Sequence, residues 1–311
     1  MSTAPAEGGA PASGSRRTGF MLLTLIVAFV FFWLYRNAPA PESGTGAAPT
    51  TGLEGFRDDA WLLPDEAMLG FVEVPAGAFV MGSNPLQDPM AYENERWSAA
   101  RRQGNPELPA YYIGRYEVTM AQFNVFAAQS GGRAAPRDGA PAYPVTGVTW
   151  PEALAYGRWL EEQMRTSPAT PRAIREALDS GWRVTLPSEA QWEKAARGVD
   201  GRIFPWGSDP GASNANFGGG SPREVTAGAC PQCSYGLADM GGNVWEMTNS
   251  PLQSYPIDPA AEPALDADAL FVMRGGSWAD TANNVRAAVR GAVDPGVRNP
   301  GIGFRLVISP P

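Results

Sequence analysis

Glycine and proline limit what this chain can fold into more than any other feature. The 311-residue sequence contains 36 glycines and 30 prolines, spread along the chain without a regular period. Both residue types favour turns and interrupt helices and strands, so we expect many turns and little regular secondary structure. Hydrophobic residues make up 44% of the chain, which is enough to bury the core of one large domain with a smaller appendage.

The sequence contains no histidine, and this excludes several kinds of active site. Ser-His-Asp and Cys-His arrangements, the usual zinc sites and two-histidine iron sites all need that side chain. Any chemistry must therefore come from carboxylates, cysteine, lysine, tyrosine or a hard metal. The formal net charge is −8 and no basic stripe is visible, which argues against a nucleic-acid partner.

The N-terminal part contains one apolar run that is long enough to cross a membrane. Residues 19–35, GFMLLTLIVAFVFFWLY, carry no charge, and a helix of this length can span the hydrocarbon core. An arginine pair precedes the run and only Arg36 follows closely, which favours a cytoplasmic N-terminus. The alternative is a cleaved signal peptide, because residues 38–40 resemble a cleavage site, although Pro41 at the next position disfavours cleavage.

We therefore divide the chain into a cytoplasmic tail (1–18), a transmembrane helix (19–35), an extracytoplasmic linker (36–68) and one folded domain (69–311). The linker begins with a stretch rich in Pro, Ala, Gly and Thr, which is typical of a flexible spacer. This division predicts a single-pass protein of the bacterial inner membrane, with its N-terminus in the cytoplasm and its main domain in the periplasm.

Within the folded domain, hydrophobic alternation predicts strands at 71–74 and 79–81, and GIGFRLVIS near the C-terminus predicts a final strand. Capping signals predict helices that begin after Thr119, Thr149 and Ser188. Between Gly198 and Phe271 little is periodic. The aromatic residues on these turns are interpreted as core plugs: Trp206, Phe217, Trp245 and Trp278.

Nine short segments in a fixed order resemble the formylglycine-generating enzyme family, also called the sulfatase-modifying-factor family. The resemblance covers about residues 71–308. It implies an α+β fold of the C-type-lectin-like kind with little regular structure, which agrees with the glycine and proline content. The matching segments are PAGAFVMGS, YYIGRYEVTMAQF, YPVTGVTWPEALAYGRWL, RVTLPSEAQWEKAARG, PWG, ANF, YGLADMGGNVWEM, RGGSW and GFRLV.

Enzymes of this family oxidise a substrate cysteine to formylglycine with two cysteines that bind copper shortly after the GGS[WY] element. Ser277 matches the family's active-site serine, but the two cysteine positions fall on Asp280 and Val285. A carboxylate is a hard ligand and cannot hold Cu(I) as thiolates do. We therefore expect a degenerate site with no catalytic residues and no copper. The family's second branch binds iron through histidines, so we expect no iron either, and no nucleotide.

The only two cysteines, Cys230 and Cys233, form a C-x-x-C motif. Such a motif can be a redox centre, half of a zinc site or a short disulfide. No second ligand pair exists, and the motif does not begin a helix that would lower a thiol pKa. We prefer a structural disulfide between Cys230 and Cys233 in an oxidising compartment.

The element DMGGNVWE resembles a calcium loop of the family. The resemblance implies ligands from the side chains of Asp239 and Glu246 and from the backbone carbonyls of Gly242 and Val244. Calcium accepts six to eight oxygen ligands, and a short loop with glycines can turn such groups inward together. The alternative is that Glu246 only accepts backbone hydrogen bonds and fixes the turn.

The leading hypothesis is a membrane-anchored, non-oxidising member of the family that binds a protein or peptide and acts as an accessory or regulatory module. The alternative is an enzyme, either a formylglycine-type oxidase that uses Cys230 and Cys233 or another activity built on Asp280. Carbohydrate binding rests on the lectin-like fold alone. The expected binding surface consists of Arg274, Ser277, Trp278, Asp280, Asn283, Asn284 and Arg286.

Overall fold

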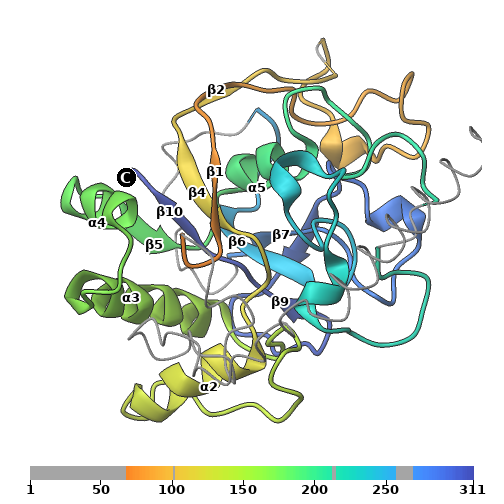
Figure 1. The fold of residues 1–311 in the computed structure, drawn as a ribbon. Coiled ribbons are helices and arrows are strands. Elements are labelled where there is room, and N and C mark those ends of the chain that lie inside the picture. Colours follow the sequence, from red (N-terminus) through yellow and green to blue (C-terminus); the bar gives the residue numbers. More distant parts are fainter. Residues whose placement is uncertain (1–67, 101, 212–214, 257–268) are drawn as a thin grey trace, which may run out of the picture. The chain divides into compact units, whose positions relative to one another are not determined.

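A computed structural model describes residues 68–100, 102–211, 215–256 and 269–311. The predicted transmembrane helix, the cytoplasmic tail and nearly all of the linker lie outside these residues. Within the described part, no helix is both long and apolar enough to cross a membrane. The described residues form an α+β fold in which short strands and helices are joined by long turns (Figure 1).

The first sheet joins the two ends of the domain. Its order is β1, β4, β10, β5, and all its pairs are antiparallel. Strand β10 lies in the centre, where Val307 pairs with Ile113 and Ile308 with Val184. The C-terminal strand is therefore required to complete the sheet that the N-terminal strand begins. The bounds are β1 Phe71–Val74, β4 Tyr111–Gly114, β5 Arg183–Thr185 and β10 Val307–Ser309.

The second sheet carries the segments that approach the candidate site. Its order is β8, β7, β6, β9, with β9 parallel to β6. Two further strands form a small antiparallel sheet, and 3₁₀ turns lie between the strands. The strands are β6 Trp245–Pro251, β7 Phe271–Arg274, β8 Gly291–Val293 and β9 Ile302–Gly303, with the two-stranded sheet β2 Gly77–Ala78 and β3 Glu107–Leu108. The turns are η1 Glu93–Glu95, η2 Val225–Gly228, η3 Ser234–Gly236 and η4 Ala282–Asn284.

Three helices begin where the capping signals predict. Thr119, Thr149 and Ser188 each accept a hydrogen bond from the backbone N–H three residues later, and the side chain at that position bonds back to the cap. These helices are α2 Met120–Gln129, α3 Trp150–Thr166 and α5 Glu189–Arg197. A fourth helix, α4 Arg172–Asp179, was not predicted. It follows Pro171 without a side-chain cap, so the sequence gives no start signal for it.

Two strand predictions need correction. The predicted strand at 79–81 is not formed. The strand there is β2 at Gly77–Ala78, and Met81 makes only an isolated bridge to Gly104. The predicted C-terminal strand is split into β9 and β10, which belong to different sheets. Between them lies Arg305, whose buried side chain makes hydrogen bonds to other elements.

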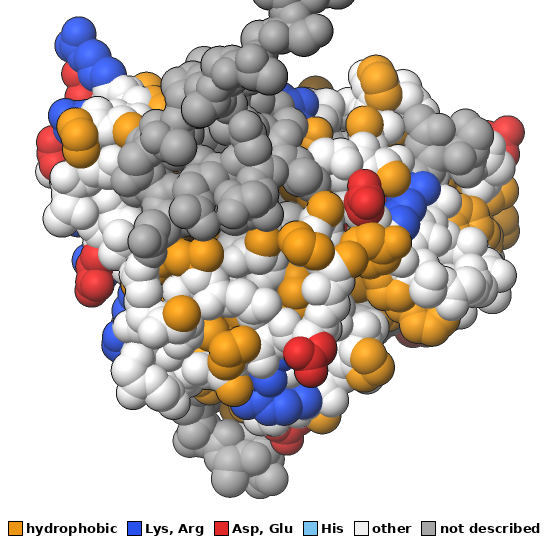
Figure 2. All heavy atoms as spheres, turned by 60° about the horizontal axis from the view of Figure 1, so that its bottom comes forward, with side chains coloured by type: hydrophobic (Ala, Val, Ile, Leu, Met, Phe, Trp, Pro, Cys, Tyr) orange, Lys and Arg blue, Asp and Glu red, His pale blue; other side chains and the backbone are white. Residues whose placement is uncertain are grey.

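The four aromatic residues of the glycine-rich turns that were interpreted as core plugs are only half-buried: Trp206, Phe217, Trp245 and Trp278. Of these, Trp245 packs against the main core. That core contains residues of α2, α3 and both four-stranded sheets, and in it Phe123, Phe126, Tyr156 and Phe304 pack edge to face or stacked. On the face seen in Figure 2, hydrophobic side chains form small groups separated by polar surface, with arginines and carboxylates close together.

Helix α5 holds the loop-rich half through buried ion pairs. Glu193 pairs with Arg274 and, at 2.7 Å, with Arg197, while Glu189 pairs with Arg290 at 2.6 Å. All five residues are buried. Because a buried guanidinium without a counter-ion is costly, these pairs tie α5 to β7 and to the chain that follows it.

We predict that Glu193→Ala lowers the free energy of unfolding by about 3–5 kcal/mol, because it leaves Arg274 and Arg197 buried with too few acceptors. Urea unfolding of the purified variant measures this. The matched control is Glu176→Ala, which removes the exposed i,i+4 pair with Arg172 on α4 and should leave stability nearly unchanged. Equal effects of the two substitutions would show that the buried pairs do not hold the fold.

Candidate functional site

The loop that follows the RGGSW element is organised around the carboxylate of Asp280. One oxygen accepts hydrogen bonds from the backbone N–H of Ser277 at 3.0 Å, from its hydroxyl at 2.7 Å and from the Trp245 indole at 2.9 Å. The other oxygen accepts from the Asn284 amide at 2.6 Å. Four donors thus surround one carboxylate. The Asp280 carboxylate therefore fixes the conformation of the loop.

Val285, at the second expected cysteine position, is completely buried. Its side chain lies under the turn at Gly276, where an added Cβ would come within 2.9 Å of it. Gly276 has a φ of +72°, a conformation that glycine adopts without strain. The structure therefore places an apolar packing residue where the resemblance requires a metal-binding thiol.

A glycine-rich strap lies against the same loop. The backbone N–H of Gly218 donates to the Asp280 carbonyl at 2.7 Å, and that of Gly219 donates to the Trp278 carbonyl at 2.9 Å. Both glycines have positive φ, and no atom lies within 4 Å of where a Cβ would be. The strap covers part of the loop with backbone alone.

The far side of the loop is fixed by Arg286, which is fully buried. Its guanidinium pairs with Asp88 and Glu95, each at 2.7 Å. The ring of Tyr92 lies 5.3 Å from this guanidinium, and its hydroxyl donates to Asn284 at 3.0 Å. These contacts fasten the segment before η1 to the candidate site.

The prediction that Arg274 and Arg286 belong to the binding surface is wrong. Arg274 and Arg286 are 0% exposed. Arg274 is surrounded by acceptors, pairing with Glu193 and donating to the carbonyls of residues 287–289. Burial lowers the pKa of a guanidinium, but nearby carboxylates, Glu193 foremost, raise the pKa of Arg274 above its usual value. Both arginines thus stay charged and hold loops in place, and a partner cannot reach them.

The remaining expected residues lie at or near the surface, apart from Ser277, which is 4% exposed. Asn283 is exposed, while Trp278 and Asn284 are half-buried. Ala279 and Thr281, which the sequence analysis did not single out, are exposed as well. The accessible part of the candidate site is therefore the segment 278–284, which we call the recognition loop.

Not all of the predicted calcium ligands have an oxygen that is free to bind a metal. Both oxygens of Glu246 are taken, by Arg305 at 2.6 Å and by the indole of Trp192 at 2.7 Å. Asp239 pairs with Arg223 at 3.0 Å, and its second oxygen has no partner. Among the described residues, no group of three or more acidic or cysteine side chains could hold a metal. Calcium stays a prediction of the resemblance, and unfolding with and without a chelator tests it.

Glu117 is a buried carboxylate near Asp239 and Glu246, and the sequence analysis did not identify it. It is 0% exposed and accepts hydrogen bonds from the Asn243 side chain at 2.6 Å and from the backbone of Val244 at 3.3 Å. Burial is the main cause that raises its pKa well above the usual value, and the charges of Asp239 and Glu246 add to it. The only feature of the sequence that could have identified Glu117 is its position in YEVT, two residues before the helix cap Thr119.

We predict that Glu117 makes the fold less stable as pH rises. Its pKa is raised in the folded state, so the native chain holds a proton that the unfolded chain loses near pH 4.3. The stability of Glu117→Gln relative to the wild type should therefore increase as pH rises above this value, by about 1.4 kcal/mol for each unit of pKa difference. Urea unfolding at a series of pH values from about 4 to about 7 measures it.

The matched control is Glu152→Gln. Burial acts to raise the pKa of Glu152, but Arg298 and its other hydrogen-bond partners lower it overall. Glu152 is thus ionised in both states over the same range, and the effect of its substitution should not change with pH. A constant difference for Glu117→Gln as well would contradict the raised pKa.

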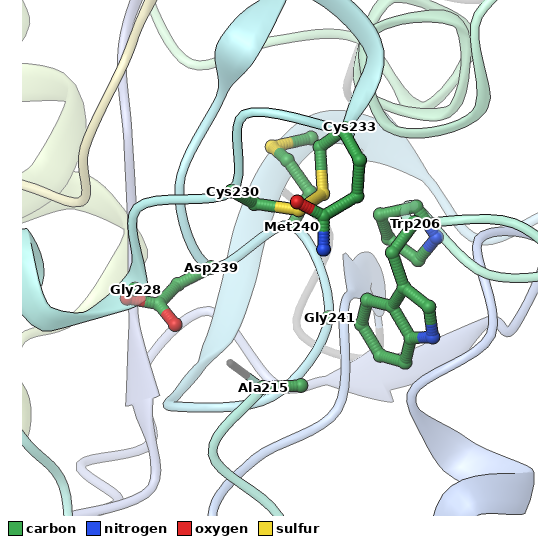
Figure 3. A pocket seen from close by; sticks show the side chains of 10 residues that line it. Trp206, Ala215, Gly228, Cys230, Cys233, Asp239, Met240 and Gly241 are labelled. Carbon is green, nitrogen blue, oxygen red and sulfur yellow. A yellow bond between two sulfur atoms is a disulfide. The ribbon is translucent and has the colours of Figure 1, made fainter. Parts of the chain in front are cut away.

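Cys230 and Cys233 are joined in a disulfide, the pairing that the sequence analysis preferred. The disulfide lies on the wall of a small cavity of about 10 Å³. Figure 3 shows the indole of Trp206 on one side of this cavity and Asp239 on another. Neither Ser277 nor Asp280 lines it.

Comparison with known proteins identifies the relatives of this domain. A family model described as sulfatase-modifying factor enzyme 1-like domain matches residues 63–310. Hercynine oxygenase of Mycolicibacterium smegmatis is 33% identical over 265 residues, which cover 76% of this chain and 60% of the relative. Inactive C-alpha-formylglycine-generating enzyme 2 of Bos taurus is 32% identical over 184 residues, covering 52% of this chain and 49% of the relative.

The chain thus matches only about half to three fifths of these two relatives' lengths. Among solved structures, PvdO from Pseudomonas aeruginosa has a similar fold, with a TM-score of 0.60 and 22% sequence identity over 76% of this chain and 93% of PvdO. At this identity the likeness concerns the fold alone.

Proposed function

The chain belongs to the sulfatase-modifying factor enzyme 1-like family, and on this premise we propose that it is a non-oxidising member that binds a protein or peptide through the recognition loop. The observation that carries the proposal is the pair of residues at the cysteine positions. Asp280 is surrounded by four hydrogen-bond donors, and the side chain of Val285 is completely buried. Neither can replace a thiolate that binds Cu(I).

The geometry also disfavours the enzymatic alternatives. An oxidase that uses Cys230 and Cys233 would need thiols beside Ser277, whereas these cysteines form a disulfide on a cavity that Ser277 does not line. A different activity built on Asp280 would need a free carboxylate oxygen, and both of its oxygens accept hydrogen bonds. The iron-dependent branch needs histidines, and the sequence has none.

The relatives include both an oxygenase and a protein whose name describes it as inactive, so family membership alone does not decide the activity. The exposed residues of the recognition loop favour a binding role. Ala279, Thr281 and Asn283 carry no charge, and they lie beside half-buried Trp278. An aromatic side chain within neutral polar surface is typical of protein interfaces.

We further propose that the domain lies outside the cytoplasm and is held at the membrane by residues 19–35. The apolar run and the arginines before it support this location, and a disulfide suits an oxidising compartment. Activity of a phosphatase fused after Pro311 tests the location. An inactive fusion in cells that make the protein would contradict it.

We predict that the purified chain does not convert cysteine to formylglycine in a sulfatase-type peptide, with or without added copper, because it lacks the thiolate pair. Mass spectrometry of the peptide measures the product. The double substitution Asp280→Cys and Val285→Cys should not restore activity, because the side chain at 285 is buried beneath the Gly276 turn. Copper-dependent oxygen consumption by the wild type would make the oxidase the better account.

The binding role has a separate test. Asn283→Arg on the recognition loop should weaken a complex captured from cells by about tenfold or more, because it places a large charge at the centre of the contact. The matched control is Glu176→Arg on the exposed face of α4, which should leave binding unchanged. Equal binding by both variants would place the partner elsewhere on the domain.

A further inference from the structure

The Cys230–Cys233 disulfide is part of a cavity wall and is separate from the main core. The cavity is also lined by Pro205, Trp206 and Met240, and an open groove next to it shares Trp206 and Gln232. Gln232, between the two cysteines, is exposed. The bond therefore lies where opening it would change the shape of a cavity without disrupting a sheet.

The turn that directly follows the disulfide holds an unfavourable backbone conformation. Tyr235 has a φ of +61° although it is not a glycine, and a bulky residue keeps such a conformation only when its surroundings enforce it. The backbone N–H of Gly236 donates to the Cys233 carbonyl at 3.1 Å, and Arg115 donates to the Gly236 carbonyl at 3.0 Å. The disulfide is a further restraint, because it fixes Cys233 at the start of this turn. When the disulfide is open, this restraint is removed and the turn can relax.

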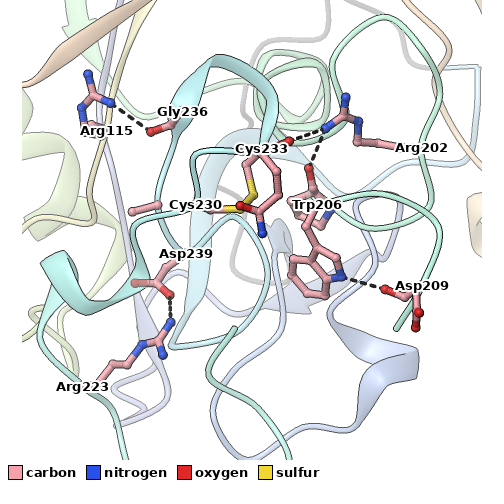
Figure 4. Close-up of a disulfide and its surroundings, with 12 residues drawn as sticks. Arg115, Arg202, Trp206, Asp209, Arg223, Cys230, Cys233, Gly236 and Asp239 are labelled. Carbon is pink, nitrogen blue, oxygen red and sulfur yellow. Dashed lines mark hydrogen bonds and ion pairs between the residues drawn. A yellow bond between two sulfur atoms is a disulfide. The ribbon is translucent and has the colours of Figure 1, made fainter. Parts of the chain in front are cut away.

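Arg202 joins this loop to the segment that carries Trp206. One nitrogen of its guanidinium donates to the carbonyls of Gln232 and Pro205, each at 3.1 Å (Figure 4). The rest of the guanidinium is held by Asp200, at 2.7 Å. A displacement of the Gln232 carbonyl therefore acts directly on the backbone next to Trp206.

Trp206 continues the connection toward the recognition loop. Its indole is parallel to the ring of Phe217, with an angle of 5° and centroids 6.4 Å apart. Phe217 precedes Gly218 and Gly219, whose N–H groups bond to the recognition loop. A contiguous set of contacts thus leads from the disulfide to the proposed binding surface.

We propose that Cys230 and Cys233 form a reversible thiol–disulfide exchange site that regulates the recognition loop. The co-reactant is a dithiol, either a small molecule or a dithiol protein. With the disulfide closed, the strap at Gly218 and Gly219 is held on the loop; with it open, the strap loosens. The regulatory meaning rests on the proposed function, whereas the structural coupling does not.

The exchange transfers two electrons. A thiolate of the dithiol attacks one sulfur of the Cys230–Cys233 bond, forms a mixed disulfide and releases the other cysteine as a thiolate, which takes up a proton. The second thiol of the reductant, as its thiolate, then attacks the reductant's first sulfur, which is the one bound to the chain in the mixed disulfide. This step releases the remaining cysteine and leaves the reductant as a disulfide, so that two thiols form on the chain and two are lost from the reductant.

A purely structural role accounts less well for this position. A disulfide stabilises a fold mainly by restricting the unfolded chain, and this effect is smallest for short loops. Only Pro231 and Gln232 separate the two cysteines. Arg202 and Asp200, which support the loop, are themselves partly exposed, at 22% and 56% for the side chains, unlike the buried pairs around α5.

Hydrogen exchange followed by mass spectrometry tests the coupling in the purified chain, oxidised and after reduction with dithiothreitol. We expect amides in 229–238 and those of Gly218 and Gly219 to exchange at least about tenfold faster in the reduced form, since their hydrogen bonds open more often. Amides of α3 should not change. The measurement needs no partner, so its outcome is independent of the binding experiment above.

Two variants sharpen the test. Cys230→Ser combined with Cys233→Ser should show the fast exchange with or without reductant; if it does not fold, reduced wild type supplies the same comparison. Arg202→Gln should keep the redox response in 229–238 and lose it at Gly218 and Gly219. Equal exchange of these two glycines in both redox states, or a disulfide that dithiothreitol cannot reduce in the folded chain, would overturn the proposal.

Discussion

Buried arginines that bind both carboxylates and loop carbonyls are the interaction on which the rest of this structure depends. With so many glycines and prolines, much of the backbone lies outside helices and sheets, and its buried carbonyls still need donors. Arg274 donates to the carbonyls of residues 287–289 and pairs with Glu193. Arg305 donates to the carbonyls of 114, 115 and 238 and pairs with Glu246. One guanidinium thus satisfies the backbone carbonyls of several turns, as the hydrogen bonds between strands satisfy those of a sheet.

This arrangement explains how the loop keeps its shape without cysteines at positions 280 and 285. The recognition loop is held by Arg286, which donates to the Asn283 carbonyl, and by the glycine strap, while Arg274 fixes the chain that follows the loop at residues 287–289. None of these contacts needs a thiol. Asp280 adds its own hydrogen bonds at the position of one cysteine, so the replacement strengthens the loop while it removes a ligand for soft metals. The contacts that shape the loop therefore do not depend on metal-binding cysteines.

The sequence predicted the parts of the fold that local chemistry decides. Capping boxes at Thr119, Thr149 and Ser188 fixed three helix starts to the residue, and the ordered segments identified the family. It did not predict what tertiary contacts decide. Helix α4 has no cap and is held by buried Ile174 and Leu178. The burial of Arg274 and Arg286, and the role of Glu117, depend on partners 80 or more residues away in sequence, and residue type alone suggests exposed charges there.

The two ways of fixing loops in this domain respond differently to their surroundings. A buried arginine–carboxylate pair is shielded from solvent, and removing one partner is costly because the other charge is then buried without a counter-ion. The loop at 230–236 lacks such a pair: Arg202 and Asp200 lie near the surface, and a covalent bond supplies the restraint. A covalent bond between sulfurs can be broken by a reductant without unfolding the core. The same architecture therefore contains buried ion pairs that solvent does not reach and a loop whose covalent restraint, on our proposal, a reductant can remove.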